Sequence, residues 1–107
     1  MKVVNIALDF GVSPGGRFPE DGEYNGQRFR EKFLIPALED SEIVKVVLDG
    51  VSGFGSSFLE EAFGGLVRIH HYEKSKLLER LHLQYSDSSL AFYADSIRDF
   101  INDAEPE

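Results

Sequence analysis

The chain of 107 residues carries 11 Lys and Arg against 19 Asp and Glu, which gives a formal net charge of −8 at pH 7. It contains no Cys, which excludes a disulfide framework, a Cys-ligated metal site and a thiol nucleophile. The acidic balance argues against a general nucleic-acid or anionic-membrane binder, because both need clustered cations. No segment approaches the roughly 20 apolar residues that span a bilayer. We therefore expect one cytoplasmic domain over residues 1–107, ordered as far as residue 103 and frayed over residues 104–107.

The N-terminal part of the sequence predicts a strand and a hairpin. Residues 3–10 alternate between two sets of side chains with a period of two, which is typical of a strand with one buried face. Residues 11–16 contain three Gly, one Ser and one Pro and predict a turn. Arg17-Phe18 would then be a short returning strand that completes an N-terminal hairpin.

Three amphipathic helices are predicted from apolar residues at helical spacing. The first covers residues 27–39, begins after Asn25 or Gly26, and has a kink or a restart at Pro36. The second follows a glycine-rich turn, and its Gly64-Gly65 pair predicts a tight approach to the sheet. The third is capped by Asp87 or Ser88. One face of the second helix is marked by Leu59, Ala62, Phe63, Leu66 and His70, and the apolar stripe of the third by Leu90, Tyr93, Ala94, Ile97, Phe100 and Ile101.

Two further strands complete the predicted fold. Residues 43–48 are apolar nearly without alternation, which indicates a central strand covered by helices on both faces. Residues 81–85 alternate and predict another strand. Strands alternate with helices after the N-terminal hairpin, so the sequence predicts a small α/β sandwich with a mixed four-stranded sheet and three helices.

The segment from the central strand to the second helix holds the most informative motif. Ser57 and Glu60 have the spacing of a capping box, in which the serine hydroxyl and the glutamate carboxylate each accept a backbone amide of the first turn. The same geometry has a functional interpretation, because a helix N-terminus with free amides can hold a phosphate attached to the Ser57 oxygen. The spacing alone favours the capping interpretation.

The strand, glycine turn, double serine and helix resemble the STAS domains, the family of anti-sigma-factor antagonists, and in particular the STAS-like family of small bacterial domains. The resemblance covers about residues 3–103 and is clearest over residues 16–18, 26–32 and 48–67. It implies that the two serines of the antagonists' motif fall on Ser56 and Ser57. Gly55 then stands at the position of the motif's aspartate, and Phe58 at that of its glycine.

What the resemblance implies is a non-enzymatic interaction module switched by phosphorylation of Ser57, or less favourably Ser56. Its partner would be a histidine-kinase-type ATPase or an anti-sigma factor. The interaction surface would surround the serines and comprise Gly53, Phe54, Gly55, Phe58, Glu60 and Glu61. Glu60 and Glu61 would repel a phosphoserine, which predicts either a poor phosphate site or an effective off-switch.

A small-molecule or nucleotide binder that uses the 50–55 turn and the start of the second helix is the alternative function. The turn follows a strand and precedes a helix, although it lacks the Lys-Ser/Thr of a Walker A loop. His70 is interpreted as a cation at a helix C-terminus rather than a metal ligand. Arg28, Arg30 and Lys32 form either a solvated face or a docking surface for an acidic partner. We predict no catalytic residues, no metal site and no cofactor.

Overall fold

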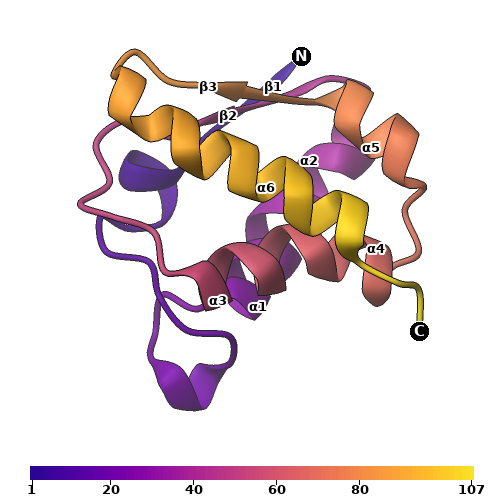
Figure 1. Cartoon of the computed structure of the whole chain (residues 1–107), viewed down its shortest axis with the longest axis horizontal. Helices are drawn as coiled ribbons and strands as arrows, with labels where there is room; N and C mark the ends of the chain where they lie inside the picture. Colours follow the sequence, from indigo (N-terminus) through magenta and orange to yellow (C-terminus); the bar gives the residue numbers. More distant parts are fainter.

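The computed structural model describes all 107 residues, with a radius of gyration of 12.4 Å (Figure 1). Strands alternate with helical segments along the chain, as the hydrophobic pattern predicts. The elements, with η for a 3₁₀ or π-helical segment, are β1 (Lys2–Asn5), η1 (Ile6–Phe10), η2 (Pro19–Asp21), α1 (Gly26–Phe29), η3 (Arg30–Leu34), α2 (Ile35–Asp40), β2 (Val44–Val47), α3 (Ser56–Leu59), η4 (Glu60–Gly64), α4 (Gly65–Arg68), α5 (Lys74–Arg80), β3 (Leu81–Gln84), η5 (Ser88–Leu90) and α6 (Ala91–Asp103).

The sheet has three strands, all parallel, in the order β1-β2-β3. The central position predicted for the strand around Val46 is confirmed, because β2 pairs with β1 on one side and with β3 on the other. In register, Val4 lies opposite Val46, and Val46 lies opposite Leu83. The prediction of a mixed four-stranded sheet is wrong, since the N-terminal hairpin does not form.

Local hydrogen bonds end β1 early and prevent the hairpin. The Asn5 side chain accepts a hydrogen bond from the Leu8 amide at 3.1 Å, and the Asp9 carboxylate accepts the Asn5 amide at 2.8 Å. These bonds favour the π-helical turn η1, so the alternation over residues 3–10 does not continue as a strand. The Arg17 and Phe18 amides each donate to the Asp21 carboxylate at 3.0 Å and are turn residues, not a returning strand.

Residues 26–40 form one continuous helix made of α1, η3 and α2. The Asn25 side chain accepts a hydrogen bond from the Arg28 amide at 2.9 Å, which confirms Asn25 as the N-cap. The restart predicted at Pro36 takes the form of a π-helical turn before it, after which the α-helix resumes at Ile35, and Leu34 and Ile35 keep helical backbone angles. The wider turn accommodates a proline that has no amide to donate.

Residues 56–68 form a second continuous helix made of α3, η4 and α4. A short helix that the sequence did not predict, α5, precedes β3, so the expected count of three helices is also wrong. The cap predicted at Asp87 is confirmed, because its carboxylate accepts the Ser89 amide at 2.9 Å at the start of η5. No helix of the structure has the length and apolar character needed to cross a membrane.

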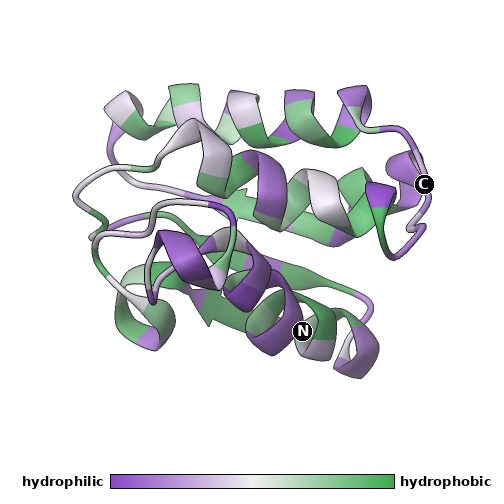
Figure 2. Cartoon of the chain, turned by 90° about the horizontal axis from the view of Figure 1, so that it is seen from below, coloured by the Kyte–Doolittle hydropathy of each residue, from purple (hydrophilic) through white to green (hydrophobic).

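The long helical segments cover one face of the sheet (Figure 1). Seen from below in Figure 2, the helix of residues 56–68 lies between that of residues 26–40 and α6. The sequence predicted helices on both faces of β2, but on the opposite face Lys45 is only partly buried and Val3 is 50% exposed. That prediction is wrong because both connections between parallel strands cross on the same side of the sheet.

A hydrophobic cluster of 23 buried residues fills the space between the sheet and the helices. Phe29 and Phe58 are fully buried at its centre, with ring centroids 5.7 Å apart. The last four residues, for which fraying is predicted, contact the rest of the domain. Ala104 is buried, and the Glu107 amide donates to the Arg68 carbonyl at 2.8 Å.

Candidate functional site

The turn after β2 carries the chain from the buried Leu48 to the start of the helix at Ser56. Gly50 has a φ of +89°, a conformation that residues with a side chain rarely adopt, so glycine is required at this position. The Ser52 hydroxyl and amide both donate to the Val12 carbonyl, at 2.9 and 2.8 Å. These bonds fasten the turn to the 11–16 segment, which holds it in one position.

The two serines lie where the sequence places them but do not cap the helix. The helix begins at Ser56, so Ser57 is within one residue of its N-terminus as predicted. Gly55, whose backbone is extended, takes the N-cap position, and no side chain accepts a hydrogen bond there. The capping-box prediction is therefore wrong, and the Glu60 carboxylate is bound elsewhere. Ser56 and Ser57 are both exposed.

The predicted interaction surface divides into exposed and buried residues. Gly55 is exposed beside the serines, and Gly53 is partly exposed. Phe58 is fully buried, and Phe54 is 8% exposed, with its ring 5.1 Å from that of Tyr93. These two phenylalanines belong to the hydrophobic core rather than to the surface, because the turn folds them inward beneath the serines.

Glu61 and Glu60 do not face solvent as two free carboxylates. The side chain of Glu61 is only 3% exposed, and its Oε2 accepts a hydrogen bond from the Arg30 Nη1 at 2.9 Å. Arg17 forms ion pairs with both glutamates, and so does Arg68. Three guanidinium groups thus surround two carboxylates, and we call this set of five residues the arginine–glutamate network.

The network favours the charged forms of Arg17 and Glu60. Hydrogen bonds to Glu60 raise the pKa of Arg17 above its ordinary value, against the opposing effect of burial. Burial opposes ionisation of Glu60, but hydrogen bonds from Arg17 and Arg68 outweigh it and hold the pKa of this carboxyl below its ordinary value. The repulsion predicted between these glutamates and a phosphoserine is therefore reduced, because three cations neutralise two anions.

Arg30 is the least exposed member of the network, at 2%, and crosses between the helices of residues 26–40 and 56–68. Its Nη1 also donates to the main-chain carbonyl of Glu61, and its Nε lies 3.2 Å from the His70 Nε2. Burial and the neighbouring Arg30 charge lower the pKa of His70, so His70 is a neutral acceptor. Both its predicted cationic role and the surface location predicted for Arg30 are wrong.

Glycines make room for the network between the helices. A Cβ atom on Gly65 would lie 2.9 Å from the Arg30 Cζ, and one on Gly26 would lie 2.8 Å from the Glu61 Cβ. A Cβ on Gly64 would lie 2.6 Å from the Glu60 Oε2. The Gly64-Gly65 pair thus leaves space for the Glu60 and Arg30 side chains. The predicted role of this pair, a close approach of the helix to the sheet, is wrong.

Helical spacing in the sequence indicates that Arg30 and Glu61 are buried, although their hydropathy predicts exposure. Arg30 lies four residues after Gly26 and four before Leu34, and both of these neighbours are buried. Residues four apart share a helix face, so Arg30 belongs to the inward-facing stripe. Glu61 lies in residues 58–67, and every residue of this segment is buried except Glu60, which is partly buried. One buried cation and one buried anion on facing helices together predict a pair.

A second feature lies at the carboxyl ends of β2 and β3, where open α/β sheets bind ligands. A pocket of about 510 Å³ separates the turn after β2 from the start of η5 and α6. The Ser86 amide and hydroxyl donate to the Asp49 carboxylate, and these bonds lower the pKa of Asp49. Hydrogen bonds from Ser89 lower the pKa of Asp87 in the same way. The pocket therefore carries two ionised carboxylates.

Nowhere in the structure are three or more His, Asp or Glu side chains placed to hold a metal ion. No curated protein and no solved structure matches the chain. The family described as the STAS-like domain of unknown function (DUF4325) matches residues 25–90, which is more than half of the chain and includes Arg30, Ser57 and Glu61. The chain belongs to this family of STAS-like domains.

Proposed function

We propose that this STAS-like domain is a non-enzymatic protein-interaction module whose partner contacts Gly55, Ser56 and Ser57 at the start of the helix of residues 56–68. The single observation that carries the proposal is the exposure of both serines above a rigid support. Phe54 and Phe58 anchor the turn in the core beneath them, and Ser52 fastens it to the 11–16 segment. A fixed, exposed segment binds a partner with little loss of conformational entropy.

Phosphorylation of Ser57 would switch this module, and the arginine–glutamate network supports that part of the proposal. Residues three and four apart on a helix are neighbours, so Ser57 shares its face with Glu60 and Glu61. The Arg17 side chain, 37% exposed, is bound to both of these carboxylates. A phosphate on Ser57 would add a charge of about −1.5 to −2 and would compete with them for Arg17.

By resemblance to the anti-sigma-factor antagonists, the partner is a histidine-kinase-type ATPase or an anti-sigma factor. The test uses purified ATPases of this class from the source organism. Each ATPase is incubated with ATP and the domain, and the sites of phosphate addition are mapped by mass spectrometry. Phosphate on Ser57, with weaker binding of the modified domain, is the expected result.

Matched variants separate a switch from a structural effect. Ser57→Asp should weaken binding of the ATPase partially, because aspartate carries about half the charge of a phosphate. Ser57→Ala should bind as the wild type does but accept no phosphate, and Ser96→Ala, on α6, should change neither property. Failure of the ATPase to bind the unmodified domain would contradict the proposed interaction, and equal binding of wild type and Ser57→Asp would contradict the switch.

A small-molecule-binding domain is the second candidate function, and the pocket between the turn after β2 and the start of α6 favours it. The pocket contains residues of the 50–55 turn, as the sequence analysis predicts for this alternative. Its ionised Asp49 and Asp87 disfavour a nucleotide phosphate and favour a ligand with an amine or hydroxyl groups. In calorimetric titrations we expect heat from a small diamine, lost in Asp49→Asn, and none from ATP or GTP. Binding of ATP would contradict this ligand class.

A further inference from the structure

The outer edge of β1 is one of the two edges of the sheet and pairs with no further strand, and the helix of residues 26–40 lies beside it. The Lys2 amide donates to the Ile43 carbonyl at 3.0 Å, so the alternation of a parallel ladder directs the N–H and C=O of Val3 away from β2. Farther along, the Asp9 carboxylate takes the outward-facing amide of Asn5. Val3 is therefore the one strand residue at this edge whose backbone groups are ready to pair with another chain.

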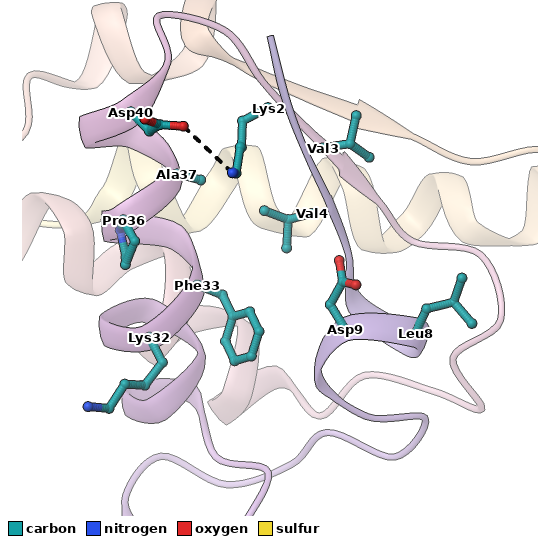
Figure 3. Close-up of a pocket in the computed structure, with 10 residues that line it drawn as sticks. All are labelled: Lys2, Val3, Val4, Leu8, Asp9, Lys32, Phe33, Pro36, Ala37 and Asp40. Atoms are coloured by element: carbon teal, nitrogen blue, oxygen red, sulfur yellow. Dashed lines mark ion pairs between the residues drawn. The ribbon is translucent and has the colours of Figure 1, made fainter.

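A groove of about 710 Å³ runs beside this edge, between β1 and the helix of residues 26–40 (Figure 3). Its middle is apolar, with Val4 facing the ring of Phe33 across the groove (Figure 3). Leu8 lies just past the end of β1 and is 83% exposed, and Val3 is 50% exposed; in Figure 3 both side chains lie on the side of β1 away from the helix of residues 26–40. An exposed strand edge and exposed apolar side chains thus lie on one continuous surface.

Each end of the groove carries one cation and one anion, so the groove of a second copy that runs in the opposite direction presents complementary charges. Lys2 lies at one end, where it pairs with Asp40 at 3.6 Å, and Asp9 and Lys32 lie toward the other end (Figure 3). These two cations and two anions cancel, although the whole chain has a net charge of −8. A second copy of the chain therefore meets no net charge repulsion at this surface, whereas the chain as a whole is acidic.

We propose that two copies of this chain associate through the β1 edge about a two-fold axis at Val3. The two β1 strands run antiparallel there, and each Val3 exchanges its N–H and C=O with the other, which joins two three-stranded sheets into one of six strands. This orientation brings the Lys2 end of each copy to the Asp9 end of the other. It also lays each Leu8 against the apolar groove of the opposite copy and removes it from water.

Sedimentation equilibrium of the full chain, from about 1 μM to about 1 mM, tests the association directly. We expect a reversible monomer–dimer equilibrium within this range. Leu8→Glu places a carboxylate in the interface and should raise the dissociation constant at least tenfold. Phe92 is the matched control, because it is 71% exposed and lies on α6, so Phe92→Glu should change the dissociation constant no more than its added charge requires. A monomer at every concentration, or equal effects of the two variants, would overturn the proposal.

A cysteine cross-link tests the axis itself, since the chain contains no Cys. In a hydrogen-bonded antiparallel pair the two Cα atoms are about 5.5 Å apart, which is within the range of a disulfide. Under mild oxidation Val3→Cys should give a covalent dimer on a non-reducing gel at concentrations where Phe92→Cys stays monomeric. Equal cross-linking of both variants, or none of Val3→Cys, would show that Val3 is not at a two-fold axis.

Discussion

Arg30 and Glu61 form an ion pair of 2.9 Å between two helices, with side chains that are only 2% and 3% exposed. An isolated charge at such a depth is costly, so each member of the pair depends on the other. Arg30 is also held by the main-chain carbonyl of Glu61. The pair fixes how the helix of residues 56–68, which begins with the exposed serines, sits against the helix of residues 26–40.

Loss of one member of this pair should destabilise the fold strongly. Arg30→Ala leaves the Glu61 carboxylate buried with only the more distant Arg17 and Arg68 as counter-ions, and we expect the free energy of unfolding to fall by about 3–5 kcal/mol. Arg28→Ala, at an exposed arginine on the same helix, should cost less than about 1 kcal/mol. Urea denaturation of both variants measures the difference, and similar midpoints would show that Arg30 is not buried in this pair.

Gly65→Ala has two physical effects of opposite sign. Alanine is the better helix former by about 1 kcal/mol, so an open helical position would be stabilised. In this structure the new Cβ would lie 2.9 Å from the Arg30 Cζ, and we expect a net destabilisation of about 1–3 kcal/mol. Gly53→Ala is the control, because the nearest atom to its new Cβ is the Tyr93 hydroxyl at 3.9 Å. Thermal melts that show a stabilised Gly65→Ala would contradict the position of Arg30.

Replacement of Ser57 by Ala should hardly change stability. A capping box would predict a loss of about 0.5–2 kcal/mol, because the hydroxyl would hold a first-turn amide. The structure gives the N-cap position to Gly55, so we expect a change within about 0.5 kcal/mol in the free energy of unfolding. Chemical denaturation distinguishes the two values. A loss of the larger size would restore Ser57 as the cap.

The neutral state of His70 predicts a pH dependence of stability. Burial and Arg30 hold its pKa in the folded protein below the ordinary value of 6.5. As the pH falls below 6.5, the unfolded chain binds a proton that the folded protein does not, so this contribution to stability is present above 6.5 and is lost on acidification. His70→Gln keeps an acceptor for the Arg30 Nε without titrating. The melting temperature of His70→Gln should therefore fall less than that of the wild type as the pH is lowered below 6.5. Parallel curves of melting temperature against pH for the two proteins would contradict the prediction.

Much of the fold was predictable because local patterns and tertiary packing agree over long stretches. The apolar run ending at Leu48 predicts the central strand, and Asn25 and Asp87 predict helix starts, because each of these signals acts within a few residues. The absence of the N-terminal hairpin was not predictable in the same way. Periodicity over residues 3–10 fits a strand, and only the hydrogen bonds among Asn5, Leu8 and Asp9 decide for a turn.

The candidate site was predicted in position but not in its interactions. The exposed serines at the helix start follow from the order of strand, glycine turn and helix. Arg68, a partner of both Glu60 and Glu61, is close in the sequence, but their partners Arg17 and Arg30 lie 43 and 31 residues away. Hydropathy assigns such charged residues to the surface, and no local rule reveals that a glycine at position 65 leaves space for one of them inside.

The strand order has a consequence for how the chain folds. Each strand pair joins residues about forty positions apart, such as Lys2 with Val44 and Val44 with Leu81, and no hairpin supplies a short-range pairing. Each of the two pairings therefore requires a long loop to close before its own hydrogen bonds form, and the entropy of that closure opposes formation of the transition state. Helix formation within residues 26–40 and 56–68 is fast by comparison, so assembly of the sheet sets the folding time.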